Sequence, residues 1–145
     1  MQFQAKHFDE LTTHELYEIA RSRTEIFLLE QKIICQDLDR IDYKSLHCFF
    51  ENEGSVVAYL RAYLTEEDTV KIGRVLTLVH KAGLGSDLWK NALSMIKENW
   101  PGKEIVVHAQ LQAQGFYEKQ GFAFTGERRI SEFDGAVEVR YERML

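Results

Sequence analysis

The stretch VHKAGLGSDLWKNAL, residues 79–93, places Gly83 and Gly85 directly before a segment whose apolar residues have helical spacing. Glycine is among the least favourable residues inside a helix, because it loses the most backbone freedom on folding. A glycine pair at a helix entrance therefore indicates unusual torsions or a ligand that approaches the backbone closely. The first N–H groups of a helix are unpaired and partly positive, so the expected ligand is an anion, most often a phosphate.

Two widespread phosphate-binding loops do not fit this stretch. A Walker loop needs Gly-Lys-Ser/Thr, but Gly85 is followed directly by Ser86, which disfavours a nucleotide triphosphatase. A dinucleotide fingerprint needs three glycines within a parallel βαβ unit, whereas the segments before Gly83 predict an antiparallel meander. The phosphate hypothesis therefore depends on the rest of the chain.

The flanking segments predict one domain, residues 1–145, with a mixed sheet and helices on its faces. Thr12 and Glu15 form a capping box, which indicates that a helix begins there. Asp134 and Gly135 predict the turn of a closing hairpin. In chain order we expect a strand at 2–8, a helix from 13, a long loop at 29–46, three antiparallel strands at 46–52, 55–64 and 69–79, a helix at 84–99, a buried strand at 104–109, a short helix at 112–121, and a hairpin of 122–130 and 136–144.

Composition excludes several classes of partner. The 145 residues have a formal net charge of -5, which disfavours nucleic acid and suits a cationic amine substrate. No apolar run has the length of a membrane span, and the first ten residues are too polar for a signal peptide. Cys35 and Cys48 are therefore expected to be free thiols in the cytoplasm. A catalytic pair of Cys48 with His47 is disfavoured, because neighbours in a strand point to opposite faces.

Two motifs together resemble the GNAT N-acetyltransferase superfamily. Residues 80–85, HKAGLG, resemble its Gln/Arg-x-x-Gly-x-Gly/Ala signature, and residues 110–122, QLQAQGFYEKQGF, resemble its Asn-x-x-Ala-x-x-Φ-Tyr-x-x-x-Gly-Phe segment. In that family the first motif holds the pyrophosphate of acetyl-CoA through backbone N–H groups. The preceding strand binds the pantetheine arm, and the tyrosine of the second motif lies near the thioester sulfur.

Further segments are similar to the ElaA-like subfamily, and together the matches cover most of the chain. These segments are residues 26–31, 36–39, 57–61 and 72–75. Three departures are present: His80 stands where the family has Gln or Arg, Gln110 replaces Asn, and the link between Thr77 and Gly83 is shorter than in the ElaA-like pattern.

The resemblance implies the GNAT acyl-CoA N-acyltransferase fold, with a V-shaped splay between the fourth and fifth strands. Residues 70–78 and 104–109 should run parallel and then separate, which leaves a cleft for pantetheine. Acetyl-CoA is the implied co-substrate, and no metal is expected. The implied cofactor-binding residues are Leu76, Thr77, Leu78, Lys81, Ala82, Gly83, Leu84, Gly85, Ser86, Gln110, Ala113, Phe116 and Tyr117.

Acetyl transfer to an amine needs a neutral amine, a stabilised oxyanion and a proton for the leaving thiolate. The resemblance assigns the proton to Tyr117 and the oxyanion contact to a backbone N–H near Leu76 and Thr77. Tyr117 could instead be an aromatic that packs on the sheet. Glu30 and His47 are the candidate general bases, each with a structural alternative: a helix-end residue for Glu30 and a buried histidine for His47.

The residues that bind the acceptor amine are the least certain of the residues predicted from the sequence. Gln31, Asp37 and Arg74 are its candidate residues. Asp37, Asp39 and Asp42 lack the histidine or glutamate of a metal site, so they are interpreted as loop caps or an acidic rim for a cationic acceptor.

Arg61 and Arg74 lie inside predicted strands, where a buried arginine needs a carboxylate. Glu30 or Asp37 could supply this carboxylate to either arginine. If Arg74 pairs with Glu30, Glu30 is a structural ion and not the base.

The predicted function is thus an N-acetyltransferase. The alternative is a CoA-binding sensor or interaction domain with little turnover, which the departure at His80 allows and Tyr117 disfavours. A polyamine, an amino acid, an antibiotic and a peptide N-terminus all remain open as acceptors. The oligomeric state is also open, with a homodimer as one option.

Overall fold

The computed structural model describes residues 1–79, 82–131 and 137–144. The hairpin turn at Asp134 and Gly135 and the residues His80 and Lys81 lie outside the described residues. The elements are β1 (Gln2–His7), η1 (Phe8–Glu10), α1 (Thr13–Arg23), η2 (Thr24–Glu30), η3 (Ile41–Lys44), β2 (Leu46–Asn52), β3 (Ser55–Leu64), β4 (Val70–Thr77), α2 (Leu84–Asn99), β5 (Glu104–Gln110), η4 (Leu111–Ala113), α3 (Gln114–Lys119), β6 (Ala123–Ile130) and β7 (Val137–Met144).

The described strands form one sheet in the order β1-β2-β3-β4-β5-β7-β6. All neighbours are antiparallel except β4 and β5, which are parallel. The meander of β2, β3 and β4 and the pairing of β6 with β7 confirm the strand predictions. Strand β4 ends at Thr77, two residues before the predicted end.

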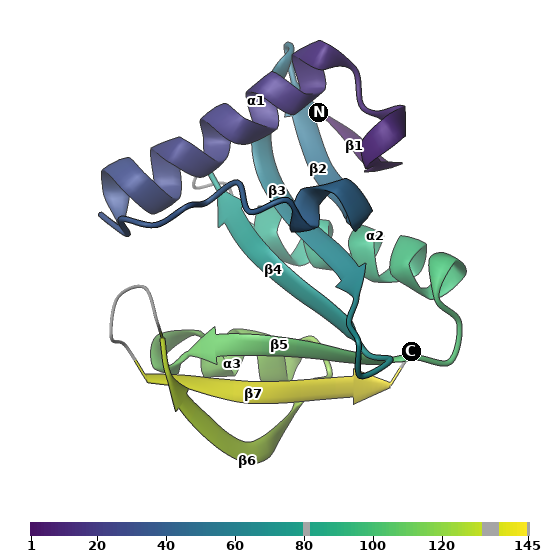
Figure 1. Cartoon of the computed structure of the whole chain (residues 1–145), viewed down its shortest axis with the longest axis vertical. Helices are drawn as coiled ribbons and strands as arrows, with labels where there is room; N and C mark the ends of the chain where they lie inside the picture. The colour runs from purple at the N-terminus through teal and green to yellow at the C-terminus, as the bar shows by residue number, and fades with distance from the viewer. Residues whose placement is uncertain (80–81, 132–136, 145) are drawn as a thin grey trace.

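The parallel pair β4–β5 is short, and this shapes the molecule. Its register contains only Val70↔Ile105 and Lys71↔Val106, after which the two strands separate. In Figure 1 the arrows of β4 and β5 diverge from their common origin toward their tips. The predicted V-shaped splay is therefore confirmed.

A β-bulge in β4 follows the last residues of this strand that pair with β5. Tyr59 of β3 faces Leu76 and Arg61 faces Gly73, so β4 has one more residue than β3 across this interval. Arg74 lies in the bulge with φ +54°, an uncommon torsion for a residue with a side chain. Bulges bend a strand and increase its twist, which directs β4 away from β5 just beyond Lys71.

Helices cover both faces of the sheet, as predicted (Figure 1). The larger core lies between the sheet and α2 with α3, around the fully buried Leu88 and Trp89. The smaller core lies under α1, where Ile19 packs with Phe49 and Tyr59.

The capping box that begins α1 is confirmed. The N–H of Glu15 donates to Thr12 Oγ1 at 3.0 Å, and the N–H of Thr12 donates to Glu15 Oε1 at 2.8 Å. Beyond Arg23 the chain does not continue as an α-helix but forms the π-helix η2.

Within the described ranges, no helix has the length and apolar character to cross a membrane.

Candidate active site

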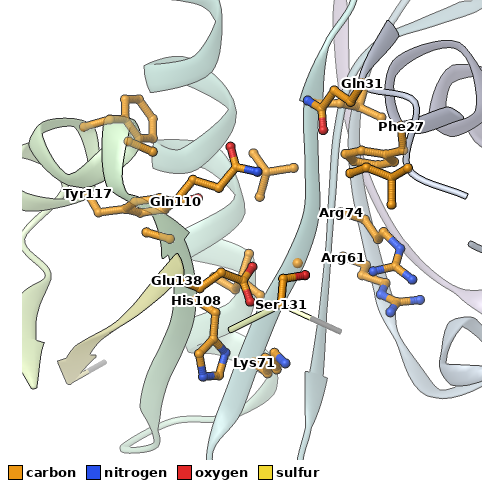
Figure 2. A pocket seen from close by; sticks show the side chains of 18 of the residues that line it. Phe27, Gln31, Arg61, Lys71, Arg74, His108, Gln110, Tyr117, Ser131 and Glu138 are labelled. Atoms are coloured by element: carbon orange, nitrogen blue, oxygen red, sulfur yellow. The ribbon is translucent and has the colours of Figure 1, made fainter. Parts of the chain in front are cut away.

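A cleft of about 710 Å³ occupies the space that β4 and β5 leave between them. Figure 2 shows Tyr117 and Gln110 on one side of it and Gln31, Phe27 and Arg74 on the other. The α3–β5 side is rich in aromatic residues, and the side toward η2 and β4 is rich in charged and polar residues. The cleft therefore joins an apolar compartment to a polar one.

Tyr117 belongs to an aromatic cluster that forms one wall of the cleft. Its ring contacts Trp89 edge to face at a centroid distance of 5.3 Å and Phe116 at 5.5 Å. Burial raises the pKa of the Tyr117 phenol to about 12, so the hydroxyl keeps its proton at neutral pH. The indole Nε1 of Trp89, a residue that lines the cleft, is buried and has no hydrogen-bond partner among the described residues.

The glycine turn delivers the N-terminus of α2 to the cleft. Gly83 is the N-cap residue with φ +81° in the left-handed region, which explains why glycine is used there. Asp87 N–H donates to Gly83 O at 2.9 Å and closes the first turn. Gly85 lines the cleft, and a Cβ atom at this position would meet the ring of Phe116 at 3.8 Å.

The π-helix η2 shapes the opposite wall. Its wider turn is closed by Gln31 N–H donating to Ile26 O at 2.9 Å, and Ile33 N–H then donates to Phe27 O at 2.8 Å. Phe27 and Gln31 line the cleft from this segment. Single π-turns are frequent at functional sites, because they change which side chains a helix presents to its neighbours.

Three arginines and three aspartates form an ion-pair network beside the cleft. Asp42 accepts hydrogen bonds from Arg23 Nη1 at 2.6 Å and from Arg61 Nη1 at 2.9 Å. Asp39 accepts two from Arg61, at 2.7 and 2.8 Å. Burial alone would raise the pKa of Asp42, but the hydrogen bonds and charges of Arg23 and Arg61 outweigh it and hold that pKa below its ordinary value.

The network also holds the bulge of β4. Arg74 Nε lies 2.8 Å from Asp37 Oδ1, and Arg74 Nη2 lies 3.3 Å from Asp39 Oδ2. Asp37 in turn binds Arg23 Nε at 2.9 Å. The two ion pairs of Arg74 compensate for its positive φ, a conformation that costs on the order of 1–3 kcal/mol.

This network corrects the interpretation of the aspartates as an acidic rim. Each carboxylate is bound to at least one arginine, so the group is close to neutral and offers little to a cationic acceptor. Arg74 pairs with Asp37 and not with Glu30, which leaves Glu30 outside the network. No cluster of three metal-ligating side chains occurs within the described ranges.

The structure brings together nine of the residues predicted for the site. These residues, all of which line the cleft, are Gln31, Arg74, Leu76, Thr77, Gly85, Gln110, Ala113, Phe116 and Tyr117. Ala82, Gly83 and Ser86 are exposed at the entrance of α2, and Leu84 is buried in the core. Leu78 N–H donates to Val57 O at 2.8 Å. Lys81 lies outside the described residues.

Neither predicted general base lines the cleft. Glu30 is exposed at the end of η2. His47 is buried in β2, where Nδ1 lies 2.7 Å from Tyr59 Oη and Nε2 lies 2.9 Å from Asp42 O. Burial lowers the pKa of His47, as expected for a histidine that stays neutral within the fold. Its contacts match the structural alternative considered for this residue.

Three charged residues and a histidine that the sequence analysis did not single out also line the cleft: Lys71, Arg129, Glu138 and His108. Each lies in a strand that the sequence predicted. The alternation of those strands indicates which residues share a face, but the order of the strands decides which faces meet. No local motif marks these residues.

A family model described as an acetyltransferase (GNAT) domain matches residues 21–145. The chain belongs to the GNAT acetyltransferase family. A UPF0039 protein of Schizosaccharomyces pombe is 34% identical to this chain, and the match covers 98% of this chain and 97% of the length of that protein. Protein ElaA of Escherichia coli is 30% identical to this chain, and the match covers 99% of this chain and 96% of the length of ElaA. The predicted resemblance to the ElaA-like branch is thus confirmed.

Solved structures agree with the family and the fold. An acyl-CoA N-acyltransferase from Pseudomonas aeruginosa superposes with a TM-score of 0.91 at 31% identity, and each chain is covered over 99%. E. coli ElaA superposes with a TM-score of 0.89 at 29% identity, with 98% of each chain covered. An aminoglycoside 6'-N-acetyltransferase in complex with coenzyme A shares the GNAT fold, with a TM-score of 0.69 at 11% identity over 97% of this chain and 96% of its own.

Removal of one charge from the arginine–aspartate network should destabilise the protein strongly. We expect Asp42→Asn to lower the free energy of unfolding by about 3–5 kcal/mol, because it leaves two buried guanidinium groups short of a carboxylate. Asp68→Asn, which removes an exposed carboxylate 2.7 Å from Lys103 Nζ, is the matched control and should cost less than about 1 kcal/mol. Urea unfolding at neutral pH measures both.

Urea unfolding at low pH checks whether the charge of Asp42 causes the loss of stability. The pKa of Asp42 is lower in the folded state than in the unfolded state. The stabilisation that Asp42 provides is therefore fully present above its unfolded-state pKa and is lost as the pH falls through its folded-state pKa. The difference between the parent and Asp42→Asn should therefore narrow on acidification. Equal stability of the two proteins at neutral pH would contradict the role given to Asp42.

Proposed function

We propose that the protein is an acetyl-CoA-dependent N-acetyltransferase that acts on a primary amine of a small molecule or peptide. The observation that carries this proposal is the cleft itself: β4 and β5 separate after Lys71, and the glycine entrance of α2 and the hydroxyl-bearing Tyr117 both border the gap. The GNAT family assignment supports the reaction type, and the shape and chemistry of the cleft support the placement of its parts.

The residues at the entrance of α2 fit the phosphates of CoA. The N–H groups of Leu84, Gly85 and Ser86 are in the first turn of α2 and have no acceptor within the helix. Gly83, as the N-cap residue, has no side-chain oxygen that would occupy them. Their partial positive charge suits a pyrophosphate, and the exposed Ala82 and Gly83 leave the backbone open to it. His80 and Lys81 would complete this loop.

The strands fit the pantetheine arm. Beyond Lys71 the edge of β4 has no ladder partner in β5, so backbone groups near Leu76 and Thr77 are available to the amides of the arm. Gln110, Ala113 and Phe116 border the same compartment from the opposite side.

The proposed reaction is direct attack of the amine on the thioester. The amine nitrogen forms a bond to the carbonyl carbon, and the oxyanion that develops is held by a backbone N–H near Leu76 and Thr77. The carbon–sulfur bond then breaks, and Tyr117 donates its proton to the thiolate. Tyr117 recovers a proton from solvent, and the acetylated nitrogen loses one to solvent or to a base.

Despite its high pKa, Tyr117 is suited to protonate the leaving thiolate. A phenol with a pKa of about 12 is a weak acid beside an ordinary thiol, whose pKa is about 8.5. Burial raises thiol pKa values as well: the buried Cys48 of this protein has a pKa of about 12. By the same effect, a thiolate released beside the buried aromatic cluster of Tyr117 is a stronger base than a thiolate in water, which favours transfer of the proton.

Replacement of Gly85 should weaken acetyl-CoA binding. We expect Gly85→Val to lower the affinity at least 10-fold, because a branched side chain on the Cβ atom, which lies 3.8 Å from the Phe116 ring, would fill the space through which the phosphates approach the backbone. Asn91→Val, at an exposed position of α2, introduces the same side chain away from the cleft and should bind like the parent. Titration calorimetry with acetyl-CoA measures both. Unchanged affinity of Gly85→Val would place the phosphates elsewhere.

Replacement of Tyr117 should slow the chemistry and leave binding intact. We expect Tyr117→Phe to keep its affinity for acetyl-CoA within a few-fold and to lower kcat by roughly 10- to 1,000-fold, because the ring stays and only the proton donor is lost. The measurement is release of CoA thiol with an accepted amine.

Tyr141→Phe is the matched control for Tyr117→Phe. Tyr141 belongs to the same aromatic cluster, but its hydroxyl binds Glu118 and Gln114, and it does not line the cleft. Its kcat should stay near that of the parent. An unchanged kcat in Tyr117→Phe would reduce Tyr117 to a packing residue. Binding of acetyl-CoA without thiol release for any amine would favour the CoA-binding sensor.

A further inference from the structure

The closed end of the cleft, where β4 and β5 pair, contains a group of charged and titratable side chains that the reaction scheme does not use. Lys71 pairs with Val106 in the register, and His108 follows two residues later, so both side chains are on the face of the sheet opposite α2. Figure 2 shows Lys71 and His108 together at this end, with Glu138 of β7 close to them. Arg129 of β6 also lines it.

Within the described part of the chain, Lys71 differs from the other cations of the cleft in making no ion pair. Arg61 and Arg74 bind aspartates, and Arg129 Nε lies 2.9 Å from Glu138 Oε1. Lys71 is half-buried, and no hydrogen bond or ion pair joins its Nζ to another residue within the described ranges. A partly buried ammonium group that makes no hydrogen bond or ion pair is unfavourable unless a ligand supplies a partner.

Among the charged groups that act most strongly on Lys71, cations outnumber anions. Burial, followed by the charge of Arg129, lowers the pKa of Lys71, and Arg61 and Arg74 add to the decrease, whereas only Glu138 opposes it. Burial also lowers the pKa of His108 to about 4, with Arg129 and Lys71 contributing, so the imidazole is neutral at neutral pH. A positive potential of this kind attracts an anion and repels a second cation.

His108 adds an unused hydrogen-bonding group. Its Nδ1 atom is buried and has no partner within the described part of the chain. With a pKa of about 4, His108 is a poor general base for an ammonium substrate, but its neutral ring can donate a hydrogen bond from one nitrogen. Both Lys71 and His108 therefore have bonding capacity that a carboxylate would satisfy.

We propose that Lys71, assisted by His108 and Arg129, binds a carboxylate of the acceptor, so that the substrate is an amine that also has a carboxylate, such as an amino acid. The inference rests on the proposed acetyl transfer and narrows its substrate class. It narrows the acceptors that the sequence left open, and it relies neither on the net charge nor on the aspartates, which are bound to arginines. A carboxylate held at the closed end leaves the amine free to extend toward the open part of the cleft.

The size of the cleft is consistent with a small acceptor. Its volume of about 710 Å³ must hold the end of the pantetheine arm as well as the acceptor. Sites for single drug-sized ligands span about 300–1,000 Å³, so the space left beside the arm suits a molecule of amino-acid size better than an antibiotic or a folded peptide.

The test compares acceptors that differ only in their carboxylate. The parent is assayed for CoA-thiol release with the common amino acids and with the carboxamide of each. We expect the carboxylate form to have the lower KM by roughly 10- to 100-fold, the range for a hydrogen bond between charged groups. Because this comparison needs no variant, it holds even if a substitution impairs folding.

Variants then assign the preference to Lys71. Lys71→Met should raise the KM for the carboxylate acceptor to that of its amide and leave the KM for acetyl-CoA unchanged, and Lys71→Arg should restore most of the preference. Lys103→Met removes a half-buried lysine that does not line the cleft and should behave like the parent. Equal KM values for acids and amides in the parent, or a preference that survives in Lys71→Met, would show that Lys71 is an ordinary solvated charge and overturn the inference.

A binding measurement separates this inference from the proposed function. Calorimetry on the CoA-loaded protein compares N-acetyl amino acids with their amides, with no need for turnover. Tighter binding of the acids in the parent and not in Lys71→Met supports the carboxylate site even if no amine releases thiol. Equal binding overturns it even if acetyl transfer to neutral amines is demonstrated.

Discussion

The bulge of β4, fixed by the ion pair between Arg74 and Asp37, is the constraint on which the cleft depends. Parallel strands normally continue to pair, because each unpaired N–H and C=O group within a sheet loses a hydrogen bond. Here the pairing stops after Lys71, and the extra residue of the bulge directs β4 away from β5. The backbone edge that this exposes is the surface suited to an extended, amide-containing ligand.

The arginine–aspartate network connects this constraint to the segment between α1 and β2. Arg23 is in α1, Arg61 is in β3 and Arg74 is in the bulge, whereas their aspartates all come from the loop around η3. The loop therefore holds three elements of the fold together and at the same time forms one wall of the cleft. Because its charges compensate one another, the polarity of the cleft is determined by the residues left over, chiefly Lys71.

Much of the architecture was predictable from the sequence, because its signals are local. The capping box at Thr12 and Glu15, the glycines at the entrance of α2 and the turn between the apolar runs of β2 and β3 each act within a few residues. The two GNAT-like motifs then led to the splay of β4 and β5. The π-helix η2 was not predicted, because a π-turn has the same apolar spacing as an irregular helix end and depends on tertiary packing for its stability.

The sequence by itself determined the family, the order of the elements and the two motifs that border the cleft. Only the tertiary structure decided which charges neutralise one another. Asp37, Asp39 and Asp42 have the same spacing whether they form an acidic rim or bind arginines from three different elements. His47 and His108 are both strand histidines, yet one is enclosed by Tyr59 and the backbone and the other lines the cleft. The reason is physical: a charge or an imidazole takes its role from neighbours distant in the chain, and strand order and burial bring those neighbours together.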